Sequence, residues 1–352
     1  MKRSRFYLFR IPKNRSSRQY AFTIVELLVV IVIIGILAAI TIVSYTGITQ
    51  RANITSLTSD LTNASTQLKL DMINNGSYPD TLSLANNGKG IPASTGTTYF
   101  YSVNNNDTPQ SFCITAIRNS ISYQIRNNDK PVPGNCLDSY GVTAWYKMDG
   151  NTNDSSDNNN NGVFSGTPQI VSGKIGQAYE FSNLQYMLTG ITNVSQDLSI
   201  SLWMRHNGSI WDSECMFGTR TSNNGFMFYR NSGDTAGYYR IYFWYTNTSD
   251  SVVGYNTWPG VSGFTADTWY NVIMTRTSDG HLKFYRNGSL VYDSPPPADF
   301  KAWHNNGAQL AFHAQGNGSA YNYGDITMDD MRIYSRSLSS DEVTELYTYA
   351  GQ

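Results

Sequence analysis

"AFTIVELLVVIVIIGILAAITIV" (residues 21–43) is an apolar stretch in which Glu26 is the one charged residue. A helix of its last 22 residues would be about 33 Å long, enough to cross the roughly 30 Å hydrocarbon core of a bilayer. Residues 1–21 hold seven Lys and Arg side chains and no acidic one. Because basic flanks stay in the cytoplasm, the stretch predicts one membrane span with a cytoplasmic leader and the remaining chain outside.

A secretory signal peptide is the alternative interpretation of this stretch. Its apolar region would be about 7–15 residues long and would end in a small-x-small cleavage site. Here Ile36 and Leu37 stand at positions before the Ala38-Ala39 pair that should be small. The length of the stretch and these two residues favour a membrane helix.

Beyond residue 21 the chain is acidic, with 18 Lys and Arg against 26 Asp and Glu, a net charge of about −8. Phosphate binding needs a basic patch, so this balance disfavours nucleic acid as a partner. All seven Trp lie beyond residue 144. This shift in composition predicts a separate C-terminal domain.

A carboxylate inside a bilayer costs on the order of 2.5–3.5 kcal/mol and usually marks function. Around Glu26, "AFTIVELLV" (21–29) resembles the processing site of type IV prepilins and pseudopilins. In that family a basic leader and Gly or Ala precede Phe-Thr-(Leu/Ile)-(Ile/Val)-Glu and an unbroken apolar helix. The resemblance implies that a prepilin peptidase cleaves between Ala21 and Phe22 and methylates the new amine of Phe22. Ala21 replaces the commoner Gly, which could slow processing.

Cleavage would give Phe22 a positive amine at the depth of the membrane. In a helical stack, this amine can meet Glu26 of another subunit, so that two costly charges become a neutral pair. The pair would set the register between subunits, as one buried polar group does in coiled coils. The expected partners are other pilin subunits, prepilin peptidase and the inner or cytoplasmic membrane.

An amphipathic stripe extends the predicted helix from Phe22 to Asn74, where "NNGSYP" (74–79) ends it because Gly76 favours a left-handed cap and Pro79 cannot continue a helix. Residues 97–126 contain β-branched and aromatic segments typical of strands. Pilins are similar, with the outer half of the helix lying across a small antiparallel sheet. The apolar stripe consists of Ile54, Leu57, Leu61, Ala64, Leu68 and Met72.

Three cysteines are present, and Cys113 and Cys136 flank the predicted strands. Thiols oxidise outside the cytoplasm, so a disulfide between them is expected, and it would contribute roughly 3 kcal/mol. Pilins resemble this arrangement, with a disulfide that fastens the end of the domain. Two unrelated buried thiols are the alternative. Cys215 is expected to be a buried free thiol.

Residues 131–141, "PVPGNCLDSYG", predict a linker, and beyond it short aromatic strands alternate with Gly, Asn and Asp turns. Residues 281–294 predict a hairpin because Asn287-Gly288 favours a type I′ turn between two alternating strands. Residues 339–350 predict a short helix with Ser at its cap and acids in its first turn. The pattern indicates an all-β sandwich or jelly roll.

The C-terminal segments resemble, in order, the concanavalin-like, laminin-G-like jelly-roll domains of bacterial surface proteins. They are "WYKMDGNTNDSSDNNNNGVFSG" (145–166), "GKIGQAYEF" (173–181), "LSISLWM" (198–204), "TWYNVIMTR" (268–276), "LKFYRNGSLV" (282–291) and "MDDMRIYSRSLSSDEV" (328–343). The resemblance to jelly-roll domains covers about residues 143–350, and the resemblance to pilins covers about residues 18–137. The expected fold is therefore an α+β pilin followed by an all-β jelly-roll sandwich. Its parts are a leader (1–21), a membrane half-helix (22–43), a head (44–137) and a jelly roll (138–352).

Enzymatic activity is not expected. Hydrolases with this sandwich carry a Glu-x-Asp-x-x-Glu run on one strand, and this sequence has no such run. The nearest acid cluster, Asp341, Glu342 and Glu345, is interpreted as a capped, solvated turn of the last helix. Four histidines show no metal-ligand spacing, and each is expected to be a surface or strand residue: His206, His281, His304 and His313.

Structural calcium is expected as a cofactor. The loop "DGNTNDSSDNNNNG" (149–162) is rich in the hard oxygen donors that calcium prefers. In the family that this domain resembles, a structural calcium joins this first loop to the Asp two residues before the apolar residue of the last strand, here Met331. The resemblance therefore implies Asp149, Asp154 and Asp329 as candidate ligands. An exposed Asx-rich turn without metal is the alternative.

Aromatic residues in Gly- and Asn-rich surroundings are candidates for carbohydrate binding. A position in the core is the alternative for each of them. The candidates are Tyr255, Trp258, Trp303, Tyr321 and Tyr323.

These observations predict a membrane-anchored, type IV pilin-like subunit, minor or at the tip of the filament, that displays a jelly-roll adhesion module at the cell surface. Its ligand would be a glycan or a surface protein of another cell. Two alternatives remain open. One is a pseudopilin of a type II secretion or DNA-uptake machine, and the other is a signal-anchored surface lectin that never polymerises.

Overall fold

The computed structural model describes residues 24–349 apart from 106–107, 120, 183, 209–212, 231–237, 257–259, 306 and 319–323. Ala21 and Phe22, the predicted cleavage site, therefore lie outside the described residues. The chain forms two compact units, Met1–Ile54 and Thr55–Gln352. The boundary falls within the first helix, so each unit is described by itself.

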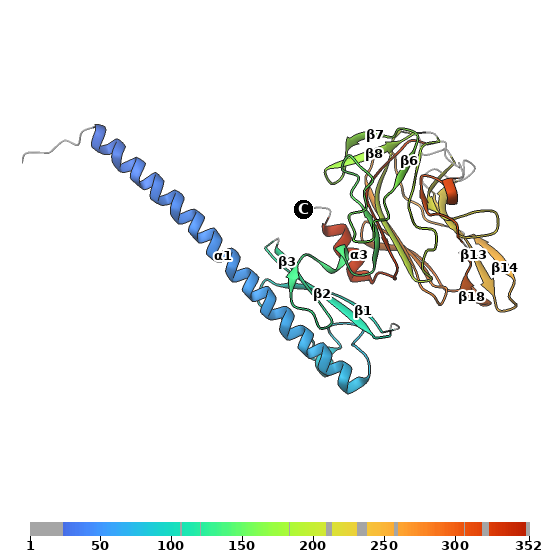
Figure 1. Cartoon of the computed structure of the whole chain (residues 1–352), viewed down its shortest axis with the longest axis horizontal. Helices are drawn as coiled ribbons and strands as arrows, with labels where there is room; N and C mark the ends of the chain where they lie inside the picture. Colours follow the sequence, from blue (N-terminus) through green and yellow to red (C-terminus); the bar gives the residue numbers. More distant parts are fainter. Residues whose placement is uncertain are drawn as a thin grey trace, which may run out of the picture. The chain divides into compact units, whose positions relative to one another are not determined.

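Helix α1 (Ile24–Asn75) runs unbroken for 52 residues, which confirms the predicted long helix over its described part (Figure 1). Its first 18 residues, Ile24–Thr41, have a mean hydropathy of 3.0, and by length and composition they can cross a membrane. The helix ends as expected, because Gly76 takes a φ of 77° and its N–H donates to the carbonyl of Met72 at 2.9 Å.

The head consists of residues 55–133, in which the outer part of α1 packs on a four-stranded antiparallel sheet of order β1-β2-β3-β4 (Figure 1). The predicted stripe supplies the helix side of this core, since Leu57, Leu61 and Leu68 are fully buried. The elements are β1 (Thr98–Asn104), β2 (Ser111–Arg118), β3 (Ile121–Arg126), β4 (Val132–Pro133) and the short α2 (Ala85–Gly88).

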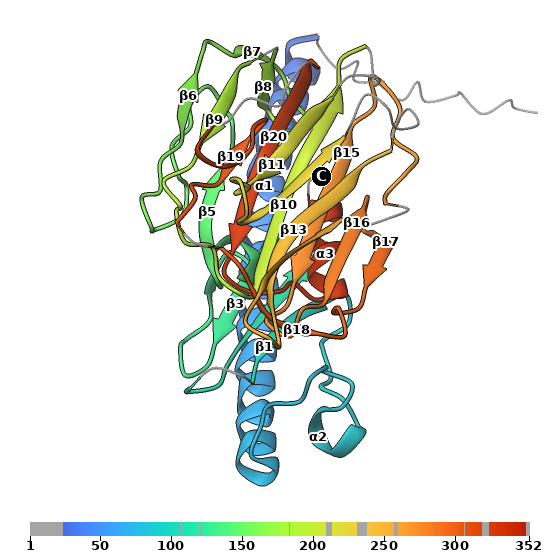
Figure 2. The same cartoon turned by 90° about the vertical axis from the view of Figure 1, so that its right-hand side faces the viewer.

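The sandwich consists of residues 142–349 and contains two eight-stranded antiparallel sheets. The β10 sheet has the order β17-β16-β15-β10-β20-β8-β7, with β5 also paired to β20. Its strands are β5 (Val142–Tyr146), β7 (Gln169–Ser172), β8 (Gln177–Phe181), β10 (Leu198–His206), β15 (Tyr270–Arg276), β16 (Leu282–Arg286), β17 (Ser289–Ser294) and β20 (Ile326–Tyr334). Figure 2 shows β10, β15 and β16 side by side, as their registers require.

The β13 sheet has the order β14-β13-β12-β11-β19-β9-β6, with β18 also paired to β13. Its strands are β6 (Val163–Ser165), β9 (Tyr186–Leu188), β11 (Glu214–Gly218), β12 (Phe226–Arg230), β13 (Arg240–Asn247), β14 (Val252–Asn256), β18 (Phe300–Trp303) and β19 (Ala311–Phe312). A 3-10 turn, η2 (Gly316–Gly318), follows. The predicted class, a pilin-like α+β unit followed by a jelly-roll-like sandwich, is confirmed.

Side chains from both sheets form one core because alternate residues of each strand point inward. Phe228 of β12 and Phe284 of β16 meet across the sandwich, with ring centroids 4.6 Å apart. The predicted hairpin is confirmed, since Asn287 and Gly288 have φ angles of 50° and 76° and form the two-residue turn between β16 and β17.

Helix α3 (Ser340–Tyr349) covers the outer face of the β10 sheet. Val343 and Leu346 are buried there with Ile273 and Tyr285 of that sheet. The N-terminus of α3 has the predicted serine cap, because Ser339 and Glu342 exchange hydrogen bonds through backbone N–H groups and side-chain oxygens. The chain thus gains a third layer on one side of the sandwich.

Candidate functional sites

Glu26 lies in the first described turn of α1, where the helix dipole favours an acidic side chain. The apolar side chains that follow it are exposed, from Leu27 at 58 % to Ile40 at 58 %. Within the described residues, none of the 18 positions of Ile24–Thr41 is buried in the protein. This surface is suited to lipid or to the same helix of another subunit.

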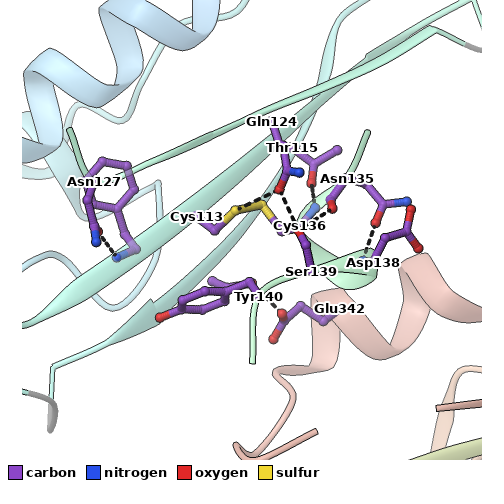
Figure 3. The surroundings of a disulfide bond; sticks show 12 residues. Cys113, Thr115, Gln124, Asn127, Asn135, Cys136, Asp138, Ser139, Tyr140 and Glu342 are labelled. Atoms are coloured by element: carbon purple, nitrogen blue, oxygen red, sulfur yellow. Dashed lines mark hydrogen bonds between the residues drawn. A yellow bond between two sulfur atoms is a disulfide. The ribbon is translucent and has the colours of Figure 1, made fainter. Parts of the chain in front are cut away.

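The predicted disulfide is present, because Cys113 of β2 and Cys136 are covalently joined (Figure 3). Cys136 belongs to residues 134–141, which we term the joint segment and which include the 3-10 turn η1 (Cys136–Asp138). Its backbone N–H donates to Thr115 Oγ1 at 2.9 Å, and Ser139 Oγ donates to Gln124 Oε1 at 3.2 Å. The head therefore holds this segment by covalent and polar contacts.

The sandwich holds the other side of the joint segment. Asp138 forms an ion pair with Arg332 of β20 at 2.9 Å. The carbonyl of Leu137 accepts from the Tyr334 hydroxyl at 3.1 Å, and that of Tyr140 accepts from Arg336 Nε at 2.9 Å. The expected linker is thus a packed connection between head and sandwich, because its polar groups are satisfied from both sides.

Two acids predicted to lie on a solvated turn are buried, so that expectation is wrong for Glu342 and Glu345 and holds only for exposed Asp341. Glu342 pairs with Arg336, whose Nη2 lies 2.6 Å from Glu342 Oε1. Glu345 is 2 % exposed, and neither carboxyl oxygen has a hydrogen-bond partner among the described residues. Burial, followed by the charge of Glu342, raises the pKa of Glu345 to about 8.

Asp154 does not fit the predicted calcium site. Its Oδ1 accepts from the N–H groups of Trp145 and Ser156, and its Oδ2 accepts from Ser156 Oγ and the N–H of Asn160, all at 2.8–2.9 Å. Four donors occupy the lone pairs of the carboxylate, which therefore organises its own loop. Within the described ranges, no three His, Cys, Asp or Glu side chains are grouped as a metal site.

The other two predicted ligands bind the same turn, residues 173–177. Asp149 Oδ1 accepts from the N–H of Gln177, and Asp329 Oδ2 accepts from that of Ile175, each at 2.8 Å. A Cβ at Gly176 would lie 2.4 Å from Asp149 Oδ1. Asp329 is fully buried, and its Oδ1 has no hydrogen-bond partner in the described part of the chain. Burial raises the pKa of Asp329 to about 7, because the charged carboxylate is costly away from water. The two side chains are hard oxygen donors of the kind that calcium prefers.

Trp303 lies in the sandwich core and does not contribute to an exposed binding surface. It is 3 % exposed, and its indole N–H donates to the carbonyl of Thr277 at 2.7 Å. Tyr255 is 40 % exposed, but its ring packs at the edge of the core against inward-facing Phe243, with 5.2 Å between the ring centroids. The remaining candidates, Trp258, Tyr321 and Tyr323, lie outside the described residues.

His206 is a buried strand residue beside Glu214, with 3.1 Å between His206 Nε2 and Glu214 Oε1, and burial lowers its pKa to about 3. His281 lies at the surface and contacts Asp293. His313 is fully buried outside the strands, so the expectation of a surface or strand position is wrong for it. His304 follows β18 and is partly buried. Cys215 is buried and belongs to no disulfide in the described part of the chain, as predicted.

Sequence reasoning missed an aromatic surface on the outer face of the β13 sheet. Tyr242 and Trp244 point outward, whereas Ile241 and Phe243 belong to the core. Alternation along β13 is the signal that could have separated the two sets. It was hidden because aromatic residues occupy both faces of this strand.

Two family descriptions match the chain. Residues 16–42 match the prokaryotic N-terminal methylation motif, and residues 181–344 match the concanavalin A-like lectin/glucanases superfamily. Both resemblances drawn from the sequence are thereby confirmed. No curated protein matches the chain.

Several solved structures resemble the chain. The binding domain of Paraclostridial Mosquitocidal Protein 1 is 17 % identical with a TM-score of 0.46, over 59 % of this chain and 52 % of that one. A second structure is domain 4 of AbnA, a GH43 extracellular arabinanase from Geobacillus stearothermophilus, in complex with arabinotriose. It is 20 % identical with a TM-score of 0.45, and the match covers 58 % of this chain and 98 % of that one. The receptor binding domain of botulinum neurotoxin D is 13 % identical with a TM-score of 0.42, and the match covers 59 % of this chain and 52 % of that one. This chain spans about half the length of the two toxin domains.

Proposed function

We propose that this chain, which joins a prepilin methylation motif to a concanavalin A-like domain, is a type IV pilin-like filament subunit that displays an adhesion module at the cell surface. One observation carries the proposal. The motif opens a single continuous helix, which has Glu26 in its first described turn and an outer half packed into a small disulfide-bonded head.

The charges at the helix start support assembly. A carboxylate at membrane depth is costly, and a processed amine on Phe22 would be costly as well. Pairing the amine of one subunit with Glu26 of the next offsets both costs and fixes their axial offset. Other pilin subunits and prepilin peptidase are the partners that this chemistry requires.

The size of the displayed domain favours a minor or tip position. A sandwich of residues 142–349 on every subunit would crowd the surface of a fibre, whereas a tip subunit has free space around it. We propose that the sandwich acts by binding a glycan and not by catalysis. The acids of α3 support this, because Glu342 is paired with Arg336 and Glu345 is buried beneath the helix.

Antibody labelling of intact cells and of sheared filaments tests this proposal, with antibody raised against residues 145–349. Labelled filaments are expected. Labelling confined to the envelope would overturn the filament role. It would favour a pseudopilin of a secretion or DNA-uptake machine if the protein is processed, and a non-polymerising surface lectin if it is not.

A structural calcium ion is a second proposal. Asp149 and Asp329 bind one turn, and the buried, unpartnered oxygen of Asp329 supports a cation there. When bound, calcium would supply positive charge that holds the first loop of the sandwich, residues 149–162, against β20. Asp154 would shape that loop without touching the ion.

A further inference from the structure

The outer face of the β13 sheet carries a group of aromatic and polar side chains with no assigned role. Register places Tyr242 of β13 opposite Asn256 of β14, and Trp244 opposite Gly254. Arg220, just beyond β11, lies over this group. We term these five residues the aromatic face. The side chains of Tyr242, Trp244, Asn256 and Arg220 are all partly exposed.

The two rings of the aromatic face are held close together. Their centroids are 5.7 Å apart, and their planes meet at 75°. A Cβ at Gly254 would lie 2.3 Å from Tyr242 Oη and 3.0 Å from two ring carbons of Trp244. Glycine at position 254 therefore lets both rings lie across strand β14. Perpendicular aromatic surfaces next to polar groups can contact the apolar C–H faces of a sugar.

Arg220 gives the aromatic face a positive charge. Its guanidinium carbon is 5.2 Å from the centroid of the Tyr242 ring, and its Nη1 donates to Gln315 Oε1 at 3.1 Å. Its Nε has no hydrogen-bond partner, and no carboxylate among the described residues forms an ion pair with it. An arginine without an acidic partner can bind the planar carboxylate of a ligand.

Two further polar atoms of the aromatic face have no hydrogen-bond partner among the described residues. They are the donor Trp244 Nε1 and the acceptor Asn256 Oδ1, whereas the amide nitrogen of Asn256 donates to Tyr229 Oη. All three unpaired atoms are turned away from solvent while their side chains remain partly exposed. A change of rotamer, which is common on binding, would bring them to a ligand.

We propose that the aromatic face binds an acidic oligosaccharide, whose rings contact Tyr242 and Trp244 and whose carboxylate pairs with Arg220. The unpaired atoms of Trp244 and Asn256 bond its hydroxyl groups. This inference rests on the proposed adhesive function and names the site and the class of glycan. A neutral glycan would leave Arg220 without a counter-charge, so the carboxylate should add affinity as well as selectivity.

Binding of the full-length protein in nanodiscs to an array of carboxylated glycans and their methyl esters tests the site. We expect at least tenfold stronger binding of the carboxylated forms by the wild type. Arg220→Gln should remove this preference, and Trp244→Ala should weaken binding of both forms. A matched control exists on the β10 sheet, where Arg205 lies 5.2 Å from the Trp269 ring, so Arg205→Gln and Trp269→Ala should bind as the wild type does.

Equal wild-type binding of acids and esters would overturn the inference, as would no binding of either form. Unchanged binding by Arg220→Gln would do the same even if Trp244→Ala fails to fold, which thermal unfolding will reveal. Antibody labelling of filaments does not depend on any of these variants. Failure of the aromatic face therefore leaves the filament role intact and separately testable.

Discussion

Ser102 of the head donates a hydrogen bond to Glu342 of α3, although the two residues are 240 positions apart. Both are buried, and Glu342 also pairs with Arg336. Together with the joint segment, this contact attaches the sandwich to the head through packed and charged groups. The connection between the two parts therefore consists of side-chain contacts as well as the chain of the joint segment.

Loss of the Glu342 side chain should destabilise this connection. Glu342→Ala leaves Arg336 buried without its partner, and removal of one member of a buried pair costs about 3–5 kcal/mol. Urea unfolding of the full chain in detergent micelles, followed by tryptophan fluorescence, measures the loss. Asp341→Ala, in the same turn but exposed, should cost less than about 1 kcal/mol. Equal effects of the two substitutions would contradict the role given to Glu342.

Stability should fall as pH rises because of Glu345. The pKa of Glu345 rises from 4.5 to about 8, chiefly through burial and then through Glu342 and Asp138, while Arg332 and Arg336 act in the opposite direction. Between pH 4.5 and about pH 8, the folded state holds a proton on Glu345 that the unfolded state has lost. The folded state therefore loses stability as pH rises through this window.

The variant Glu345→Gln should not show this loss. We expect its free energy of unfolding to match that of the wild type at pH 4 and to exceed it at pH 9 by on the order of 5 kcal/mol, since the pKa rises from 4.5 to about 8 and each pKa unit corresponds to about 1.4 kcal/mol. Denaturant titrations at the two pH values give the difference. A difference that does not change with pH would show that Glu345 is charged in the folded state.

Calcium should raise the thermal stability of the full chain. The midpoint of unfolding is expected to be higher in millimolar calcium than in EGTA, by several degrees if the ion binds the folded state alone. Asp149→Asn and Asp329→Asn should each abolish the difference, because each removes a charged ligand. Identical melting curves of the wild type in calcium and EGTA would remove the metal from this account.

Local patterns predicted much of the fold. The stripe that contains Leu57, Leu61 and Leu68 identified the buried side of α1, and Asn287-Gly288 identified the hairpin, because both depend on residues close in sequence. The disulfide between Cys113 and Cys136 followed from compartment and resemblance. The buried stripe and the hairpin are each encoded within a short segment.

Features that depend on distant contacts were not predicted. Asp138 and Tyr140 look like parts of a polar linker until Arg332 and Arg336, nearly 200 residues later, are placed against them. Trp303 lies in a polar context, yet its pairing with β13 places it in the core. The same long-range pairing explains why the orientation of Tyr242 and Trp244 remained hidden in an entirely aromatic run.

Replacement of the membrane carboxylate should block assembly without blocking insertion. Glu26→Ala removes a charge whose cost in the bilayer is about 2.5–3.5 kcal/mol, so the helix should enter the membrane at least as well as the wild type. The variant should nevertheless be absent from sheared filaments, because the amine of Phe22 would lose its partner. Immunoblots of membrane and sheared fractions measure both outcomes, and normal incorporation would refute the pairing.

The N-terminus of the mature protein tests the central claim most directly. Intact-mass and peptide mass spectrometry of the protein from sheared filaments should find a chain that begins at Phe22 with a methylated amine. A mature chain that begins at Met1, or at any residue other than Phe22, would contradict the filament account.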